Sequence, residues 1–195
     1  MKVDYNKQFE EISKTSNGKK LLLHACCAPC ATTCLERTKT FKTDLFFYNP
    51  NIDGENEFVK RLNELVRFTN EVYGKEVKVI ETKYNAQEFS NAINGLENEP
   101  ERGKRCYICY KLRLEETAKY AKENGYDYFA TTLTLSPHKN ADWLNEIGFA
   151  LGKEYGVKYL PTDFKKQNGY LNSIKLSEKH GLYRQNYCGC EFSKK

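Results

Sequence analysis

The chain has 195 residues, of which 39% are hydrophobic and 29% charged, and its formal net charge is +5. This length predicts a single domain over residues 1–195 with its own hydrophobic core, so the fold does not need disulfide bonds. No apolar run approaches the roughly 18 residues of a membrane span, and the first residues lack the apolar core of a signal peptide. We therefore expect a cytoplasmic protein without membrane association.

Short apolar runs alternate with amphipathic segments along the chain, which is typical of a parallel sheet covered by helices on both faces. The expected strands are residues 20–25, 44–48, 77–80, 127–133 and 157–160. The expected helices are residues 5–14, 32–40, 55–73, 85–93, 106–122 and 141–155, with a weakly helical region at 165–180. The pattern predicts an α/β fold with a parallel Rossmann-like (HUP-like) sheet flanked by helices, followed by a cysteine-rich C-terminal segment.

Most of the chemically reactive side chains follow a predicted strand or begin a predicted helix. Residues 26–30 follow the first strand, residues 134–140 follow the fourth, and residues 163–166 follow the fifth. In a parallel sheet the carboxyl ends of the strands meet at one edge, where ligands bind. We therefore expect a metal or cluster site at this edge.

The eight cysteines fall into three groups along the chain. They are Cys26, Cys27, Cys30 and Cys34; Cys106 and Cys109; and Cys188 and Cys190. A reducing compartment disfavours structural disulfides and favours metal binding or catalysis. Two Cys-x-x-Cys pairs, far apart in sequence, fit a pocket between elements and supply enough thiolates for a 4Fe–4S cluster.

Each cysteine group also has a plainer interpretation. Cys34 lies one helical turn after Cys30 and is expected in the core, whereas Cys30 fits a ligand or a core position equally well. Cys106 and Cys109 could be a half-buried pair on a helix. Cys188 and Cys190 enclose a glycine, and a disulfide between them would close a strained, easily reduced ring suited to two-electron storage. Otherwise they are two exposed thiols without a role.

Several polar residues are weaker candidates. His138 follows a strand end, where it could donate a proton, bind a metal or only bond the backbone. Lys165 and Lys166, next to Asp163, could contact a phosphate, although neighbouring lysines are usually only solvated. Three cations that precede Cys106 would offset the charge of thiolates; they are Arg102, Lys104 and Arg105.

Six ordered segments that span nearly the whole chain resemble the QueH type of epoxyqueuosine reductase. They are residues 24–30, 48–52, 105–109, 132–140, 163–166 and 183–190. The resemblance implies the two-electron reduction of epoxyqueuosine to queuosine at the wobble position of a tRNA anticodon, the last step of queuosine biosynthesis. The implied partners are a tRNA that carries epoxyqueuosine and an external electron donor, but not DNA.

The resemblance also assigns roles to individual residues. It implies that Cys26, Cys27, Cys106 and Cys109 hold a 4Fe–4S cluster, beside which a mononuclear iron could bind. With Cys30 as a further candidate, the expected metal ligands are Cys26, Cys27, Cys30, Cys106 and Cys109. The implied redox-active pair is Cys188 and Cys190. We expect His138 or Asp163 to donate a proton, and we expect tRNA contacts from Arg105, Lys139, Lys165 and Lys166.

Three other functions fit parts of the sequence. The first is a metal-free thiol-disulfide oxidoreductase built on Cys188 and Cys190, and the second is a zinc-bound RNA-binding module without catalysis. The third is a nucleotide-dependent tRNA enzyme on a related fold. The loop after the first strand has no glycine-rich phosphate cradle, which argues against the third function.

Overall fold

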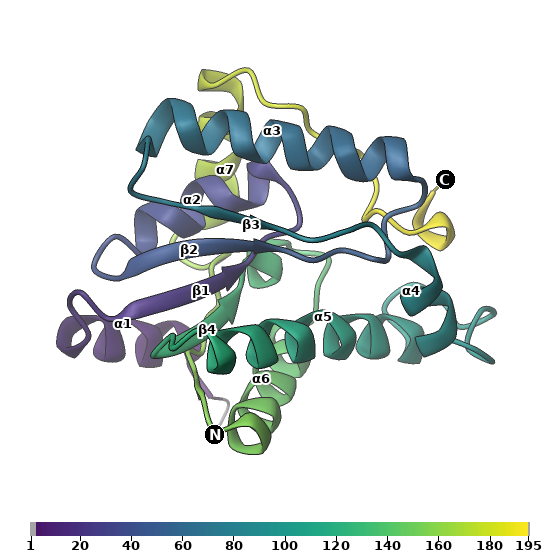
Figure 1. Cartoon of the computed structure of the whole chain (residues 1–195), viewed down its shortest axis with the longest axis horizontal. Helices are drawn as coiled ribbons and strands as arrows, with labels where there is room; N and C mark the ends of the chain where they lie inside the picture. Colours follow the sequence, from purple (N-terminus) through teal and green to yellow (C-terminus); the bar gives the residue numbers. More distant parts are fainter. Residues whose placement is uncertain (1–2, 195) are drawn as a thin grey trace.

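The computed structural model describes residues 3–194, which form a parallel five-stranded sheet flanked by helices (Figure 1). The strands are β1 (Lys20–His24), β2 (Lys42–Phe47), β3 (Val79–Glu81), β4 (Tyr128–Thr131) and β5 (Lys158–Tyr159). They lie in the order β3-β2-β1-β4-β5, with every neighbouring pair parallel. The predicted α/β fold with a Rossmann-like sheet is therefore confirmed, and its strand order reverses between β1 and β4.

Helices cover both faces of the sheet. They are α1 (Tyr5–Thr15), α2 (Ala28–Arg37), α3 (Glu55–Tyr73), α4 (Ala86–Ala92), α5 (Lys104–Glu123), α6 (Ala141–Tyr155) and α7 (Gly169–Lys179), with 3-10 turns η1 (Thr132–Leu135) and η2 (Glu191–Ser193). Helices α2 and α3 pack on one face and α5 and α6 on the other (Figure 1). Among the described residues, no helix is both long enough and apolar enough to cross a lipid bilayer.

The central strand β1 shows why the sequences of the strands are continuous apolar runs. Leu21 and Leu23 pack into the core on the α2 and α3 side, while Leu22 packs into the core on the α5 and α6 side. None of the three has any exposed surface. Because successive side chains point to opposite faces and both faces are buried, the three central positions of this strand are apolar. The two ends are polar, with Lys20 exposed and His24 buried.

Several boundaries differ from those expected, and three of the differences lie at the carboxyl edge of the sheet. Helix α2 begins at Ala28 instead of Thr32, because Pro29 occupies its first turn, where the fixed proline backbone suits a helix. Helix α5 begins at Lys104, two residues early. Strand β4 ends at Thr131, whose hydroxyl accepts the N–H of Leu133 and starts η1. As a result, Cys30 and Cys106 each lie in the first turn of a helix.

A close backbone approach fixes the start of α7. A methyl group at Gly169 would overlap the carbonyl oxygen of Phe164, and a backbone oxygen cannot move aside as a flexible side chain can. We expect Gly169→Ala to lower the free energy of unfolding by about 2 kcal/mol through overpacking. Chemical denaturation measures this change. An unchanged denaturation midpoint would mean that α7 shifts freely at this point.

Candidate metal and redox site

A cavity of about 460 Å³ opens where five segments from distant parts of the chain meet. Its wall comes from the start of α2, the loop after η1, the start of α5, the first turn of α7 and the C-terminal segment. Figure 1 places the C terminus close to α4, at the edge toward which the strands point. Six of the eight cysteines, all within the described residues, line this cavity; they are Cys26, Cys27, Cys30, Cys106, Cys188 and Cys190.

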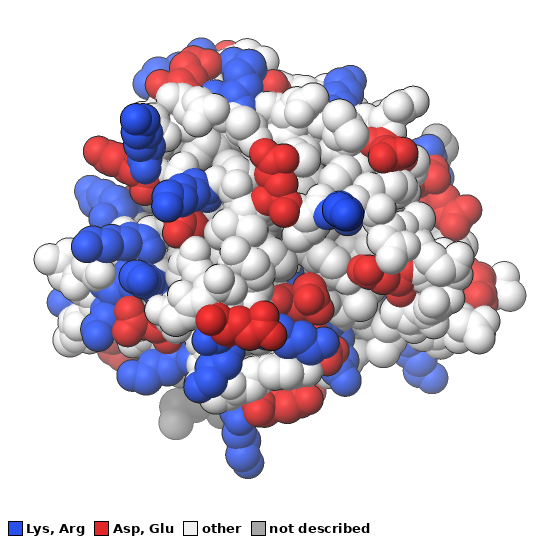
Figure 2. Space-filling model, viewed as in Figure 1, with Lys and Arg blue, Asp and Glu red and all other residues white. Residues whose placement is uncertain are grey.

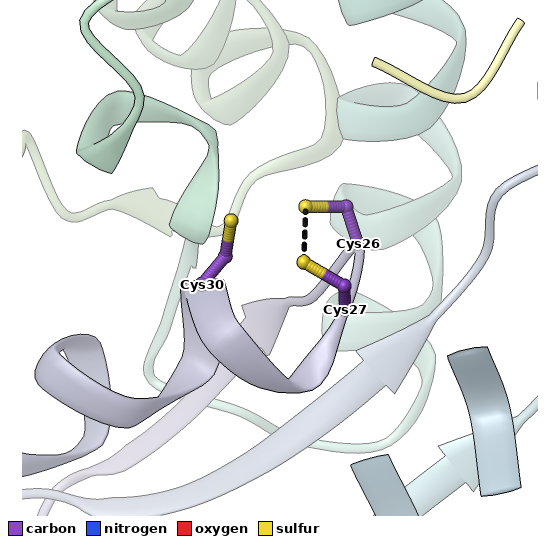
Figure 3. A group of neighbouring side chains, drawn as sticks. All are labelled: Cys26, Cys27 and Cys30. Carbon is purple, nitrogen blue, oxygen red and sulfur yellow. Dashed lines mark hydrogen bonds between the residues drawn. The ribbon is translucent and has the colours of Figure 1, made fainter. Parts of the chain in front are cut away.

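Three of these cysteines form a tight group at the start of α2 (Figure 3). The sulfur atoms of Cys26, Cys27 and Cys30 all lie within 4.8 Å of one another, and those of Cys26 and Cys27 are 3.7 Å apart. Hydrogen bonds from Cys27 and Cys30 hold the pKa of the Cys26 thiol well below its usual value. The same contact with Cys26 raises the pKa of Cys27 to about 12. Three sulfurs that face one point are a ligand set suited to a thiophilic metal.

The second cysteine pair lies on α5, across the cavity. Cys106 lines the cavity, and its sulfur accepts the backbone N–H of Arg102 at 3.2 Å. Cys109 is 7% exposed, and burial raises the pKa of its thiol to about 12. In the described chain, neither of these sulfurs belongs to the three-sulfur group of Cys26. Of this pair only Cys106 lines the cavity, whereas Cys109 packs with Phe89 and Ile93 beside it. The structure therefore brings the two pairs near each other without closing them around a single point.

The eighth cysteine lies away from the cavity. Cys34 has no exposed surface and packs in the hydrophobic core between α2 and the sheet, as the sequence predicts. Burial raises the pKa of its thiol well above the usual value, so Cys34 stays protonated.

Helix α3 holds the C-terminal segment over the cavity. Arg61 is 1% exposed, and its Nη1 donates to the carbonyl oxygen of Cys188 at 3.3 Å while its Nε contacts Glu57 at 2.7 Å. Gly189 adopts φ 133° and passes so close to Arg61 that a Cβ there would lie 3.1 Å from Nη1. The glycine between the two cysteines thus lets the backbone fit against the buried guanidinium. Cys188 and Cys190 are both free thiols.

His138 and Lys139 lie on the wall of the same cavity as the sulfurs. Arg102 donates to Nδ1 of His138 at 2.9 Å. Because a guanidinium can only donate, Nδ1 is the acceptor and Nε2 carries the proton of the neutral ring. Burial alone would lower the pKa of Lys139, but the nearby thiols of Cys188 and Cys26 raise it overall. Lys139 is therefore charged beside the thiols.

Arg105 has a largely structural environment, although it also lines the cavity. It is buried, and its Nη1 donates to the backbone carbonyl of Glu97 at 2.7 Å. Its guanidinium lies 4.2 Å from the ring centre of Phe192. Arg105 therefore ties the acidic loop at residues 95–103 and the C-terminal turn η2 to the start of α5.

The segment after β5 lies outside the cavity wall. Asp163 forms an ion pair with Lys165 at 2.9 Å, and the backbone N–H of Lys165 donates to the carbonyl of Thr134. Of the described residues that line the cavity, none comes from residues 163–166, so Lys166 also lies outside it. The structure therefore does not bring Asp163, Lys165 or Lys166 to the sulfurs.

Sequence reasoning missed two buried arginines at this site. Arg61 and Arg113 are each 1% exposed, on α3 and α5 respectively. A signal was present, because Arg61 lies among Phe58, Leu62 and Leu65 on the apolar stripe of α3. A charged residue on a stripe that packs into the core indicates a buried charge.

Comparison with known proteins identifies the family. The model of the family described as epoxyqueuosine reductase QueH matches residues 21–195. Proteins named epoxyqueuosine reductase QueH from Staphylococcus epidermidis and Streptococcus pyogenes are 42% and 40% identical to the chain, over 98% and 100% of it and 85% and 79% of their own lengths. A relative with the same name from Thermotoga maritima is 36% identical, with 89% of each chain covered. The chain therefore belongs to the epoxyqueuosine reductase QueH family.

Proposed function

We propose that this protein is an epoxyqueuosine reductase, an oxidoreductase that converts epoxyqueuosine to queuosine in the anticodon of a tRNA. The observation that carries the proposal is the meeting of six cysteines in one cavity of a chain from this family. The reaction consumes two electrons and two protons, breaks both C–O bonds of the epoxide, and releases the oxygen as water. A site rich in thiols suits such a redox reaction.

We propose that the cavity holds a 4Fe–4S cluster, with an iron ion next to it. The chemistry of the donors fits, since all are thiols: Cys26, Cys27, Cys106 and Cys109 would hold the cluster, the last from beside the cavity, and Cys30 would contribute to the adjacent iron. A cluster bound there would supply electrons one at a time. The buried cations around the sulfurs support the assignment, because several thiolates in one cavity need positive charge nearby.

We propose that Cys188 and Cys190 store the two electrons that the reaction consumes. Oxidation of the two thiols to a disulfide releases two electrons and two protons, which matches what the epoxide consumes. An external donor would then reduce the disulfide. The strained ring of a Cys-x-Cys disulfide makes this reduction favourable.

For the proton that goes to the departing oxygen, the geometry favours His138 over Asp163. His138 lines the cavity with a proton on Nε2, whereas Asp163 is paired with Lys165 outside the wall. A neutral imidazole that carries a proton can donate it to a developing alkoxide.

A modest salt dependence of tRNA binding is the expected electrostatic signature. Figure 2 shows that Lys and Arg are most numerous at the end of this face that lies over the amino ends of the strands, away from the site. Binding would therefore use the few cations at the cavity, with about three phosphate contacts. Affinity should fall roughly 20- to 40-fold between 50 and 200 mM salt, as a filter-binding titration can measure.

A pair of variants locates these contacts. Lys139→Ala should weaken tRNA binding and lower the slope of affinity against salt by about one unit. Lys42→Ala, an exposed lysine at the start of β2, should leave both unchanged. A flat salt dependence, or equal effects of the two variants, would count against phosphate contacts at the cavity.

The reaction itself is tested with anaerobically purified protein, a chemical reductant and tRNA that carries epoxyqueuosine. Nucleoside analysis of the digested tRNA should show epoxyqueuosine replaced by queuosine, in proportion to the reductant consumed. Unchanged epoxyqueuosine with iron-loaded protein would contradict the proposed function. Full conversion by iron-free protein would favour the metal-free thiol reductase.

A further inference from the structure

Arg113 carries a charge inside the protein without a carboxylate partner. It lies on α5 one turn after Cys109 and is 1% exposed. Its Nε donates to the backbone carbonyl of Cys109 at 3.2 Å, while its Nη2 is buried without a hydrogen-bond partner. None of the ion pairs formed by the described residues includes Arg113. This guanidinium is therefore buried with most of its donor capacity unused.

The other buried arginine of the site gives a direct contrast. Arg61 is equally buried, but Glu57 on the same helix neutralises its charge through a 2.7 Å ion pair. A buried charge is costly unless an opposite charge lies close by. Arg113 therefore needs a counter-ion other than a carboxylate. Without one, the desolvation of its charge lowers the stability of the folded protein.

The groups around Arg113 indicate which anion could be its counter-ion. The titratable groups that interact with its charge include the thiols of Cys109, Cys188 and Cys26 and the hydroxyl of Tyr110, whose ring centre is 5.9 Å from the guanidinium. The buried imidazole of His24 also feels this charge, which lowers its pKa, so His24 cannot serve as the counter-ion. No Asp or Glu is among them. These thiols come from three separate segments that share one site. The anion that can neutralise Arg113 is thus a centre made of thiolates.

We propose that Arg113 is the fixed counter-charge of the metal–thiolate centre, a positioning residue that raises the reduction potential of that centre. This inference rests on the proposed function. A cluster held by thiolates is anionic, and reduction adds a further negative charge, so a cation in a low-dielectric interior stabilises the reduced form most. Arginine suits this role because it cannot lose its proton inside a protein. Lys139 adds charge from the cavity wall, nearer to solvent, where water screens it.

The inference is tested by redox titration of the iron-loaded protein, followed through its visible absorbance. Arg113→Met removes the charge and keeps a long side chain, and it should lower the midpoint potential by about 60 mV, a tenfold change for a one-electron couple. Arg113→Lys keeps the charge and should restore most of the potential. Leu114→Ala is the matched control, because it removes a fully buried neighbour without changing charge. It should lower stability and leave the potential unchanged.

A second readout does not depend on iron. In iron-free, reduced protein, Arg113→Met removes a buried cation without a partner, so it should raise the thermal midpoint by about 3 °C. A lower midpoint, or a loaded variant with full iron and the potential of the unaltered protein, would overturn the inference. Failure of the unaltered protein to bind iron would instead contradict the proposed function, and the iron-free comparison would still decide the role of Arg113.

Discussion

Cys109→Ser should leave the protein without its iron and without turnover. Cys109 is buried beside the cavity as a proposed ligand, and a serine hydroxyl does not replace a thiolate as an iron ligand. Loss of a neighbouring group around a metal ligand already costs 10- to about 100-fold in metal affinity, so loss of the ligand itself should cost at least about a hundredfold. Iron content and visible absorbance after anaerobic reconstitution measure the first effect, and queuosine formation measures the second.

Cys34→Ser is the matched control for this substitution. Cys34 is also buried, but it packs in the core between α2 and the sheet, away from the cavity. The control should lower stability, because it buries a hydroxyl in an apolar environment, and it should keep full iron and turnover per folded molecule. Normal iron content and normal rate in Cys109→Ser would remove that residue from the ligand set.

Cys188→Ser should separate electron storage from metal binding. The variant should retain iron, because the proposed ligands lie on α2 and α5, but it should lose sustained turnover, because a disulfide can no longer form with Cys190. The expected result is conversion of less than one equivalent of epoxyqueuosine per enzyme, against many equivalents for the unaltered protein. Quantification of queuosine over time, with limiting and excess tRNA, measures the difference.

Two outcomes would change this assignment. Loss of iron in Cys188→Ser would make Cys188 a metal ligand instead of a redox thiol. An unchanged rate over many turnovers would leave Cys188 and Cys190 without a catalytic role. Cys190→Ser should behave as Cys188→Ser does, because the disulfide requires both thiols.

Much of the fold was predictable because the strands are buried on both faces. Continuous apolar runs such as Leu21–Leu23 locate the central strands, and alternating strands and helices fix a parallel sheet. The predicted boundaries were wrong where local backbone interactions decide them. Pro29 favours a helix that begins at Ala28, and the hydrogen bond from Leu133 N–H to the Thr131 hydroxyl ends β4 and begins η1. Neither effect follows from hydrophobic periodicity.

The meeting of the cysteines was predictable from topology, but their grouping was not. Strand ends in a parallel sheet share one edge, which brings Cys26 and the start of α5 together. Whether Cys30 joins Cys26 and Cys27 depends on the extra helical turn that begins at Ala28, which periodicity did not predict. For the same reason, the sequence left Cys30 equally divided between ligand and core.

Residues 163–166 show the limit of reasoning from strand ends. They follow β5 at the expected edge, but Lys165 is bonded to Thr134 of η1 and paired with Asp163, which keeps the segment out of the cavity wall. The buried arginines were missed for a different reason. Hydrophobic periodicity locates buried positions by their apolar side chains, whereas Arg61 and Arg113 occupy buried positions of α3 and α5 with charged ones.

The iron and acid-labile sulfide content of anaerobically purified protein, with its absorbance spectrum, decides whether these thiols form an iron–sulfur centre. The result that we expect is four to about five irons and about four sulfides per chain, with a broad visible absorbance that fades on reduction. Stoichiometric zinc without iron, or a colourless protein that converts epoxyqueuosine at full rate, would contradict it.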